Sequence, residues 1–304
     1  MEGNAMNRRE FVTRTAAFGL IGPMVFQKRA FAAESGKVET ISDGFLELPT
    51  NFLLPNGLPD NIPGMSLEEV AAEGTFKVSC NVTAVRRPNG VVVFDCGAGP
   101  NFMPSAGDLD QNFAAAGIDP EEVTDVIFTH AHPDHLWGVV DDFDELLFPE
   151  ANYHIAQTEW DFWNSDGALG TVGEERQSFV VGAQNRFDAI GDRIAFFEPG
   201  DEVLTGIEAV DAKGHTPGHT AFVVHGDEPT MVVGDAISNN PISFLRPDLA
   251  WGADMDPDAG AETRKRLLDR LASERMRFVG FHLPDGGMGH VERKGGAYRF
   301  VAGS

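Results

Sequence analysis

The spacing of apolar residues changes along the chain, and these changes predict an alternation of strands and helices. Residues 38–48 and 76–96 are predicted to be β-rich, with a Pro- and Gly-rich connection at 49–64 between them. Shorter apolar runs predict further buried strands at 126–129, 153–156, 194–197, 221–224, 231–233 and 278–281. Helices are expected at 108–116, directly after residue 156, within 173–190 and at 261–276.

The helix expected at 261–276 has two distinguishable sides. Leu267, Leu268 and Leu271 are predicted to face the core, and Arg264, Lys265 and Arg270 are predicted to face solvent. No short-period repeat and no low-complexity linker interrupts the alternation of elements. The simplest prediction is a single domain of layered α and β structure.

The composition is that of a folded globular chain. Its 304 residues are 42% hydrophobic and include 23 phenylalanines, which is enough for a substantial core. The formal net charge is −24, from 47 acidic and 23 basic residues. A chain with this negative charge is not expected to bind the phosphates of nucleic acids tightly, and binding to an anionic membrane surface is disfavoured as well. We therefore expect no nucleic-acid partner.

The N-terminal residues resemble a twin-arginine export signal. Arg8 and Arg9 precede an apolar region at 15–26, and residues 30–32 have the small-x-small pattern that a signal peptidase recognises. The apolar region is far shorter than the roughly 20 residues of a transmembrane helix, so no membrane anchor is expected. The interpretation is a cleaved signal peptide at 1–32 and one domain at 33–304. A basic amphipathic helix of the folded protein is the alternative.

This interpretation has consequences for location and charge. The twin-arginine translocation machinery would be a partner during export, and the mature protein would be periplasmic or secreted. Removing residues 1–32 takes away five basic and two acidic residues, which leaves 18 basic and 45 acidic ones and a net charge of −27. Anionic substrates would be repelled at long range.

An exported protein can hold a disulfide, and the chain has two cysteines, Cys80 and Cys96. Asn89 and Gly90 between two β-rich runs predict a hairpin turn. With these as the two turn residues, Cys96 faces Thr83 and lies too far along the strand from Cys80 for a disulfide. The prediction is two buried free thiols.

Three histidines and an aspartate occupy six positions after the strand predicted at 126–129. The run is His130-Ala131-His132-Pro133-Asp134-His135. Imidazole nitrogen and carboxylate oxygen are ligands that suit zinc and related metals. At this spacing His130 and His132 can point one way while Asp134 and His135 point another. The run therefore indicates two metal ions on one short loop.

Further ligand types follow other apolar runs or tight turns. They are His215 in the Gly- and Pro-rich turn at 214–219, Asp235 after the apolar residues 231–233, and His282 at the end of the apolar run 278–281. In each case the local sequence frees a side chain at a strand end. We expect these side chains to join the same site.

The order of these four motifs resembles the metallo-β-lactamase superfamily over about residues 38–301. The resemblance implies an α/β fold, a four-layer αββα sandwich of two mixed sheets flanked by helices, with metals at one edge of the sheets. It also implies a ligand set: His130, His132 and His215 for the first metal, Asp134, His135 and His282 for the second, and Asp235 as a bridge. His219 would orient its neighbours from behind the ligands.

Three other residues near strand ends receive ordinary structural roles. Asp95 matches a family position that is usually structural. His154 and His225 are interpreted as structural or surface histidines. None of the three is expected to bind a metal.

Two divalent ions at such a site define the expected chemistry. At about 3.5 to 4 Å apart they lower the pKa of a bridging water, and the bridging hydroxide is the expected nucleophile. Asp134 is expected to accept or pass a proton in addition to acting as a ligand. Zinc suits the ligand set best, and manganese, iron or cobalt can occupy the same geometry.

Differences between branches of the family narrow the substrate. A bridging carboxylate such as Asp235 is typical of the hydrolytic branches and is absent from the β-lactamases proper. Many lactone-hydrolysing members have a tyrosine three residues later, where this chain has Ser238. The export signal, the ending at 282–284 and the segment 159–163 resemble exported enzymes of the methyl parathion hydrolase type. Candidates for an aromatic pocket suited to an uncharged ester are Trp160, Trp163, Phe244 and Trp251, with His290 as a further pocket residue.

The main hypothesis is a dinuclear metal-dependent hydrolase of an uncharged small-molecule ester, whether carboxylic ester, lactone or phosphotriester. A lactonase of the quorum-quenching type is the closest alternative. An iron redox protein or a non-catalytic protein on the same fold is the alternative of another class. Metal identity and loss of turnover on chelation separate these hypotheses. The sequence leaves the oligomeric state open and is compatible with a homodimer.

Overall fold

The apolar runs of the sequence form the strands of two sheets. The computed structural model describes residues 36–57 and 74–303. The signal peptide predicted at 1–32 lies outside the described residues, and so does the end of the connection predicted at 49–64. All elements below belong to one unit, Phe31–Ser304.

The first sheet is built from the N-terminal half of that unit. In the described residues it has six strands in the order β1-β2-β3-β4-β5-β6. Their bounds are β1 Lys37–Pro49, β2 Thr75–Arg87, β3 Gly90–Phe94, β4 Val123–Ile127, β5 Asn152–Ala156 and β6 Ile194–Phe197. The first three strands pair antiparallel, and β3 to β6 pair parallel. The sheet is therefore mixed.

The second sheet is built from the C-terminal half. Its described strands number seven and lie in the order β13-β12-β11-β10-β9-β8-β7. Their bounds are β7 Glu202–Leu204, β8 Ile207–Asp211, β9 Thr220–Val224, β10 Thr230–Val232, β11 Arg277–Val279, β12 Met288–Lys294 and β13 Ala297–Ala302. Only β10 and β11 pair parallel among these strands. This sheet is mixed as well.

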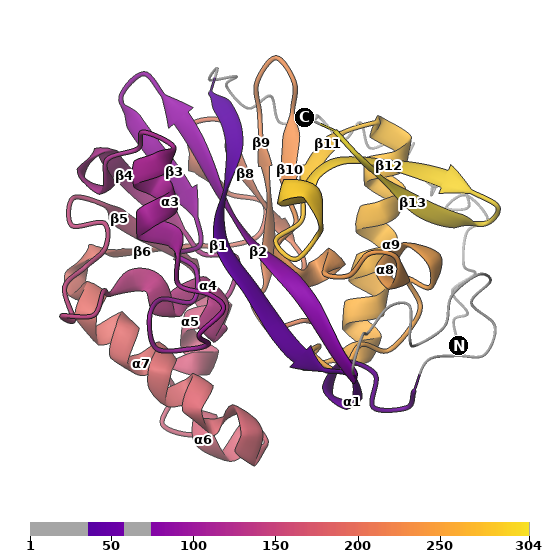
Figure 1. The fold of residues 1–304 in the computed structure, drawn as a ribbon, viewed down its shortest axis with the longest axis horizontal. Helices are drawn as coiled ribbons and strands as arrows, with labels where there is room; N and C mark the ends of the chain where they lie inside the picture. Colours follow the sequence, from indigo (N-terminus) through magenta and orange to yellow (C-terminus); the bar gives the residue numbers. More distant parts are fainter. Residues whose placement is uncertain (1–35, 58–73, 304) are drawn as a thin grey trace, which may run out of the picture. The chain divides into compact units, whose positions relative to one another are not determined.

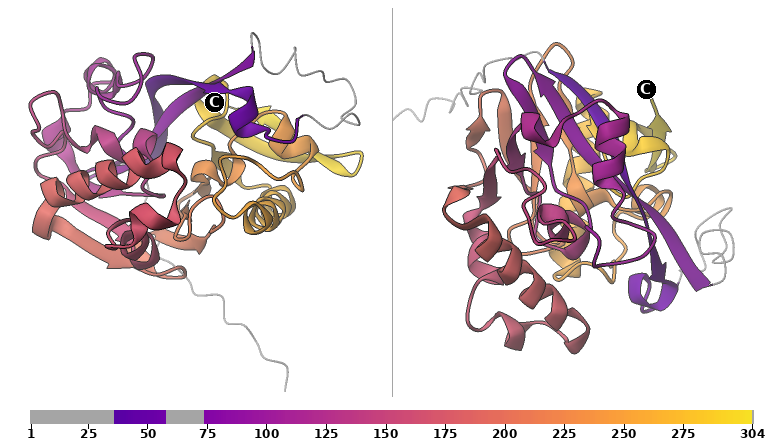
Figure 2. Two further views of the ribbon diagram at one scale, coloured as in Figure 1. Left: turned by 90° about the horizontal axis from the view of Figure 1, so that it is seen from below. Right: turned by 60° about the vertical axis from the view of Figure 1, so that its left-hand side comes forward.

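Helices cover the outer faces of the two sheets. The α-helices are α1 Thr50–Leu53, α3 Leu109–Ala115, α4 Pro133–Leu136, α5 Gln157–Trp163, α6 Ala168–Thr171, α7 Gln177–Ile190, α8 Ile242–Leu245 and α9 Pro257–Glu274. Short 3-10 helices are η2 Pro120–Glu122, η3 Trp137–Val139, η4 Glu174–Arg176, η5 Gly191–Arg193, η6 Gly234–Ile237 and η7 Asp285–Gly287. Within this unit, α7 and α9 lie on opposite sides of the pair of sheets (Figure 1), and the view from below keeps them apart in the same way (Figure 2). The predicted αββα sandwich is confirmed.

Three apolar layers explain why strands such as β3 are apolar at every position. Val91 and Val93 pack into the cluster under the helices of the first sheet, whereas Val92 and Phe94 pack into the cluster shared with the second sheet. Successive side chains of a strand point to opposite faces, so a strand buried on both faces is apolar throughout. On the other side of the second sheet, a third cluster contains Leu267, Leu268 and Leu271 of α9, as predicted.

The hairpin between β2 and β3 differs from the prediction by one residue at the turn. Pro88 and Asn89 are the turn residues, and Thr83 faces Phe94 instead of Cys96. Gly90 is the first residue of β3, where a Cβ would lie 2.5 Å from Cγ2 of Thr124. Both this close approach and the positive φ of 138° favour glycine here. The predicted free, buried state of both cysteines is confirmed.

Two features of the second half were not predicted correctly. The sequence analysis did not predict β7, β8, β12 or β13. Arg264 was assigned to the solvent side of its helix, but its side chain is buried and Nη2 lies 2.7 Å from Oδ2 of Asp254. The spacing of residues in the helix could not show that the carboxylate of Asp254 lies against this side of α9. Among the helices described, none has both the length and the apolar character needed to cross a bilayer.

Candidate metal centre

The loop after β4 carries four of the predicted ligands. The strand ends at Ile127, and Pro133 is the first residue of the short helix α4, which holds Asp134 and His135. Proline is favoured at this position because its missing N–H is not needed in the first turn. His130, His132, Asp134 and His135 are all buried. The loop therefore presents its ligand atoms toward the protein interior and not toward bulk water.

The other three predicted ligands come from the second sheet. His215 lies in the turn between β8 and β9, Asp235 lies in η6 directly after β10, and His282 follows β11. All three side chains are buried. The structure thus brings residues from four separate segments, 130–135, 215, 235 and 282, to one place.

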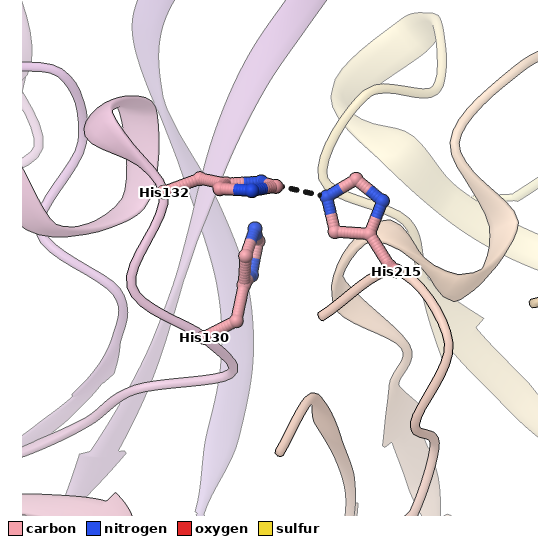
Figure 3. Close-up of side chains that lie close together, drawn as sticks. All are labelled: His130, His132 and His215. Carbon is pink, nitrogen blue, oxygen red and sulfur yellow. Dashed lines mark hydrogen bonds between the residues drawn. The ribbon is translucent and has the colours of Figure 1, made fainter. Parts of the chain in front are cut away.

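A first group consists of His130, His132 and His215. One nitrogen from each ring lies within 4.8 Å of the others. His130 and His132 project from one loop and His215 faces them from another segment (Figure 3), with 2.8 Å between Nδ1 of His132 and Nε2 of His215. Nε2 of His130 and Nε2 of His132 are buried and form no hydrogen bond among the described residues. Three converging imidazoles of this kind could hold one metal ion.

A second group consists of His135, His282 and two carboxylates. Nε2 of His135 lies 3.2 Å from Oδ1 of Asp235 and 3.4 Å from Oδ2 of Asp134. Nε2 of His282 lies 3.1 Å from Oδ2 of Asp235 and 3.2 Å from Oδ2 of Asp134. Asp235 also reaches the first group, because its Oδ2 is 3.4 Å from Nε2 of His215. Its carboxylate lies between the two groups, where the family resemblance expects a bridge.

The two groups hold their imidazoles in opposite electrostatic environments. Burial lowers the pKa of His130 and His132 well below the ordinary value, and the neighbouring histidines add to this effect. Burial also opposes the charged forms of His135 and His282, but nearby carboxylates outweigh it and raise both pKa values well above the ordinary range. His130 and His132 are thus neutral imidazoles, whereas His135 and His282 are imidazoles matched with anions.

Hydrogen bonds from outside the groups orient several of the ligands. Nδ1 of His135 lies 2.8 Å from Oδ2 of Asp95, whose carboxylate also accepts the backbone N–H and hydroxyl of Thr129. Nδ1 of His282 donates to the carbonyl oxygen of Ser79 at 2.8 Å. Such contacts fix ring orientation in metal sites. Asp95, expected to be structural, therefore positions a predicted ligand.

His215 is oriented from the second half of the chain. Its Nδ1 lies 3.1 Å from Oδ1 of Asp254, and Oδ2 of Asp254 accepts from Arg264 at 2.7 Å. Arg264 in turn donates to the carbonyl oxygens of Pro247 and Leu249. A buried chain of side chains thus connects α9 through Asp254 to His215. The sequence analysis missed Asp254, because nothing near it in the sequence resembles a ligand motif.

Glu159 is a second residue that the sequence analysis missed. Its side chain is buried on α5, and each carboxylate oxygen accepts two hydrogen bonds. Oε1 accepts from the backbone N–H of Ala131 and from Trp163, and Oε2 accepts from the hydroxyl of Thr216 and the N–H of Gly218. One carboxylate therefore ties the loop of His130 and His132 to the turn that carries His215. The role of Glu159 could not be seen in the sequence, because the loop at 130–135 and the turn at 214–219 meet its carboxylate only in the folded chain.

His219 lies behind the predicted ligands, as expected. Its Nε2 accepts the backbone N–H of Asp235 at 3.0 Å, and its ring centroid is 5.0 Å from that of His130. Burial and the neighbouring His215 lower its pKa to about 3. The ring is therefore a neutral acceptor at the start of the segment that carries Asp235. Two other histidines pair with carboxylates away from the site, His154 with Asp125 and His225 with Glu208.

Cys80 is an unexpected member of the second group. Its Sγ lies with one ligand atom each of Asp134 and His282 in a cluster whose atoms are all within 4.8 Å of one another. The side chain is fully buried on β2. The sequence indicated only a free, buried thiol at this position and gave no sign that it lies near the ligands.

A small cavity of about 60 Å³ ends at the two groups and opens to solvent. His132, Asp134, His215, Asp235 and His282 lie among its lining residues. The rest of the lining is Leu46, Leu48, Phe52, Phe102, Pro133, Arg176, Phe179 and Ala253. Its walls are therefore largely apolar, and Arg176 is the one basic residue in this lining.

The predicted pocket aromatics require correction, because none of Trp160, Trp163, Phe244, Trp251 and His290 lies among the residues that line this cavity. Trp163 is buried behind His132 and donates to Glu159. Trp160 packs on Phe187 and Phe196, Phe244 on Phe278 and Phe300, and Trp251 on Phe76. His290 lies within β12, paired with Val301 of β13. Trp163, Phe244 and Trp251 are part of the core and Trp160 packs against it, whereas His290 is half-buried on its strand. Apolar residues from β1, α1 and α7 line the cavity in their place.

Comparisons with known proteins agree with this architecture. The family model described as "Metallo-beta-lactamase superfamily" matches residues 76–282. The solved structure of AidC, a dizinc quorum-quenching lactonase in complex with a product, is 27% identical with a TM-score of 0.79, over 90% of this chain and 98% of that chain. No curated protein matches the chain significantly.

Two further solved structures show the same fold at lower identity. The hydrolase AbOPH of the β-lactamase superfamily is 24% identical with a TM-score of 0.79, over 90% of this chain and 97% of that chain. A probable metal-dependent hydrolase from Staphylococcus aureus is 16% identical with a TM-score of 0.63, over 90% of this chain and 100% of that chain.

Proposed function

Because the chain belongs to the metallo-β-lactamase superfamily, we propose that it is a dinuclear metal-dependent hydrolase of uncharged esters, with lactones as the first substrate class. One observation carries the proposal: two groups of buried ligand atoms share Asp235 at the inner end of an apolar cavity. The similarity to AidC, a dizinc lactonase, supports lactones as the class to test first.

The residues present fit a metal site. Five buried atoms of the two groups form no hydrogen bond among the described residues: Nε2 of His130, His132 and His135, Oδ2 of Asp134 and Oδ1 of Asp235. Buried polar atoms normally find a partner, and imidazole nitrogen and carboxylate oxygen are donors that suit zinc. Metal binding would satisfy all five.

The proposed ligand set follows the two groups. His130, His132 and His215 would hold one ion, Asp134, His135 and His282 would hold the other, and Asp235 would bridge them. Divalent ions held in this way supply Lewis acidity and an activated water for hydrolysis. Zinc is the proposed metal, with manganese, iron and cobalt as competitors for the same donors.

The chain itself contributes binding, exclusion of water and proton handling. The leucine and phenylalanine side chains of the cavity favour an apolar substrate, and they limit the water around the reacting bond. The excess of acidic residues disfavours an anionic substrate at long range. Asp134, which lines the cavity and faces both His135 and His282, is the proposed proton carrier in addition to its role as a ligand.

The experiment compares three esters on one preparation. Initial rates for a medium-chain lactone, a chromogenic phosphotriester and an aryl carboxylic ester are measured on zinc-loaded, manganese-loaded and chelated protein. The expected result is fastest cleavage of the lactone, with loss of turnover on chelation. Fastest cleavage of the phosphotriester would move the assignment to the methyl parathion hydrolase type. Bound iron without hydrolysis of any ester, or no turnover with any metal, would overturn the proposal in favour of a redox or binding role.

We also propose that the chain is exported by the twin-arginine route, on the basis of Arg8 and Arg9 and the apolar region that follows them. The test is cell fractionation of the full chain beside a variant with Arg8→Lys and Arg9→Lys. Processed protein in the periplasm for the parent chain, and unprocessed cytoplasmic protein for the variant, is the expected result. Equal export of both would remove the twin-arginine assignment.

A further inference from the structure

Cys80 occupies a position on β2 that is set by its neighbours in sequence. The residue before it, Ser79, accepts a hydrogen bond from Nδ1 of His282 through its carbonyl oxygen. The residue after it, Asn81, donates through Nδ2 to the carbonyl oxygens of Phe281 and Leu283, on either side of His282. Residues 79–81 therefore hold the backbone and ring of His282, and the thiol of Cys80 is kept beside that ring.

The space beside this thiol has the properties of a ligand position. Sγ of Cys80 and ligand atoms of Asp134 and His282 lie within 4.8 Å of one another, and all three residues are buried. Oδ2 of Asp134 is buried and has no hydrogen-bond partner among the described residues. Donor atoms around a tetrahedral zinc ion lie roughly 3.5 Å apart, from the usual zinc–ligand lengths. The upper limit of 4.8 Å on the spacing of the three atoms allows them to converge on one ion.

We propose that Cys80 is a sulfur ligand of the second metal, together with Asp134 and His282. This inference rests on the proposed function, because it requires that the second group binds a metal. On binding, the thiol loses its proton to solvent and the thiolate sulfur donates an electron pair to the ion. A thiolate in this place favours zinc, cobalt or cadmium over manganese or magnesium.

Charge balance supports a third anion in the site. Two divalent ions bring four positive charges, and the carboxylates of Asp134 and Asp235 offset two of them. A thiolate at Cys80 offsets a third and leaves one positive charge in a buried site. Uncompensated charge is costly away from water, so the thiolate lowers the cost of holding the second ion.

The test uses cobalt, because a thiolate bound to Co²⁺ absorbs in the near ultraviolet through sulfur-to-metal charge transfer. Chelated full-length protein is titrated with Co²⁺ under anaerobic conditions, in the parent chain and in Cys80→Ser and Cys96→Ser. Cys96 is the matched control, because it is the other cysteine, is also fully buried and belongs to none of the metal-ligand groups of the described residues. The charge-transfer band is expected in the parent chain and Cys96→Ser and is expected to be lost in Cys80→Ser.

Each outcome decides the proposal. A parent chain that binds two cobalt ions without the band, or a band that persists in Cys80→Ser, would overturn it. If Cys80→Ser does not fold, Cys96→Ser still decides, because Cys80 is then the one thiol of the chain. Failure of the proposed function is a separate result: the band with no cleavage of any ester would leave the sulfur ligand standing, and cleavage without the band would remove only the ligand.

Discussion

The loop at 130–135 and the second-sheet ligands supply the metal centre in different ways. The loop brings four predicted ligands in six consecutive positions after one strand. His215, Asp235 and His282 each follow a different strand of the second sheet, so each depends on its own contacts for orientation. The loop therefore gathers its four ligands through local sequence, with Asp95 and Glu159 holding it from outside, whereas the dispersed ligands are brought together only by the tertiary structure.

The contacts that hold the dispersed ligands cross between the two halves. Asn81 of the first sheet holds the backbone on both sides of His282, and Glu159 of α5 holds the turn after His215. The support of His215 by Asp254 and Arg264 and the support of Asp235 by His219 come from the second half alone. The second-sheet ligands are thus positioned partly by the first sheet, and substitutions can separate these contributions.

The largest effect is expected from Asp235→Asn, because Asp235 faces ligands of both groups. The amide removes the negative charge that would bridge two cations, and a loss of about 3 kcal/mol in transition-state stabilisation lowers turnover by on the order of 100-fold. The measurement is kcat on the best ester beside metal content per chain. Full activity with two bound ions would contradict the bridging assignment and weaken the distinction between the two sets of ligands.

The next effect is expected at Asp254, which supports a second-sheet ligand from its own half. Asp254→Asn weakens the hydrogen bond to His215 and leaves Arg264 without its carboxylate. Loss of such outer contacts lowers metal affinity by about 10-fold to 100-fold. The measurement is zinc affinity by competition with a chromogenic chelator.

Asp256→Asn is the control for that variant, because Asp256 caps α9 by accepting from the N–H of Ala259 and makes no contact with His215 among the interactions described. Asparagine caps helices as well as aspartate, so stability and affinity are expected to stay at the parent level. An Asp254 variant with parent-level affinity would show that the turn alone orients His215.

The contrast between local and dispersed ligands also explains what the sequence could predict. The loop at 130–135 and its strand could be predicted because the apolar run and the ligands are adjacent in sequence. Strand β3 could be predicted because both of its faces are apolar, and β4 to β6 because each contains a short apolar run. The edge strand β13 and its neighbour β12 were missed because they carry charged side chains on exposed positions such as Glu292 and Arg299. The four-layer fold itself came from the family resemblance.

The walls of the cavity could not be predicted for a different reason. Leu46 and Leu48 lie on β1, and Phe179 lies on α7, more than 130 residues later. No pattern within either segment shows that they face the same space. Large aromatic residues were expected there instead, because an apolar pocket favours them, but the core takes them up. Cys80 and Asp254 escaped prediction in the same way, since their roles arise from neighbours distant in sequence.

A smaller effect is expected from Glu159→Gln, which tests the contact between the halves. The amide keeps one acceptor oxygen but turns an NH₂ group toward two of the four buried donors. Leaving such groups unsatisfied costs about 1–3 kcal/mol of stability. The measurement is urea unfolding of the chelated protein, beside its zinc affinity.

The two readouts separate two roles for Glu159. Lower stability together with weaker zinc binding is the expected pair, because the carboxylate holds segments that carry His130, His132 and His215. Lower stability with unchanged zinc affinity would mean that Glu159 stabilises the fold without positioning the ligands. The positions of His215, Asp235 and His282 would then depend less on the first half of the chain than their contacts indicate.

The smallest effect is expected from Glu39→Gln, on the first sheet and apart from the ligands. Burial raises the pKa of Glu39, but Lys37 and Arg86 outweigh it, so the pKa in the folded state lies below the ordinary value of 4.5. A carboxyl group whose pKa is lower in the folded state than in the unfolded state stabilises the fold at pH values above 4.5. This contribution is lost as the pH falls through the folded-state pKa. At pH 7 the variant is expected to be less stable by about 0.5–1 kcal/mol, and the difference should close as the pH falls through the lowered pKa of Glu39.

Glu47→Gln is the matched control for Glu39→Gln, because Glu47 pairs with Lys77 at 3.2 Å on the same strand but both side chains are more than half exposed. Its effect on urea unfolding is expected to be close to zero. Zinc affinity should stay at the parent level in both variants, because neither carboxylate contacts the segments that position ligands. A loss of zinc affinity in Glu39→Gln would show that the ligand loops respond to the first sheet as a whole, and the local specification argued for residues 130–135 would fail.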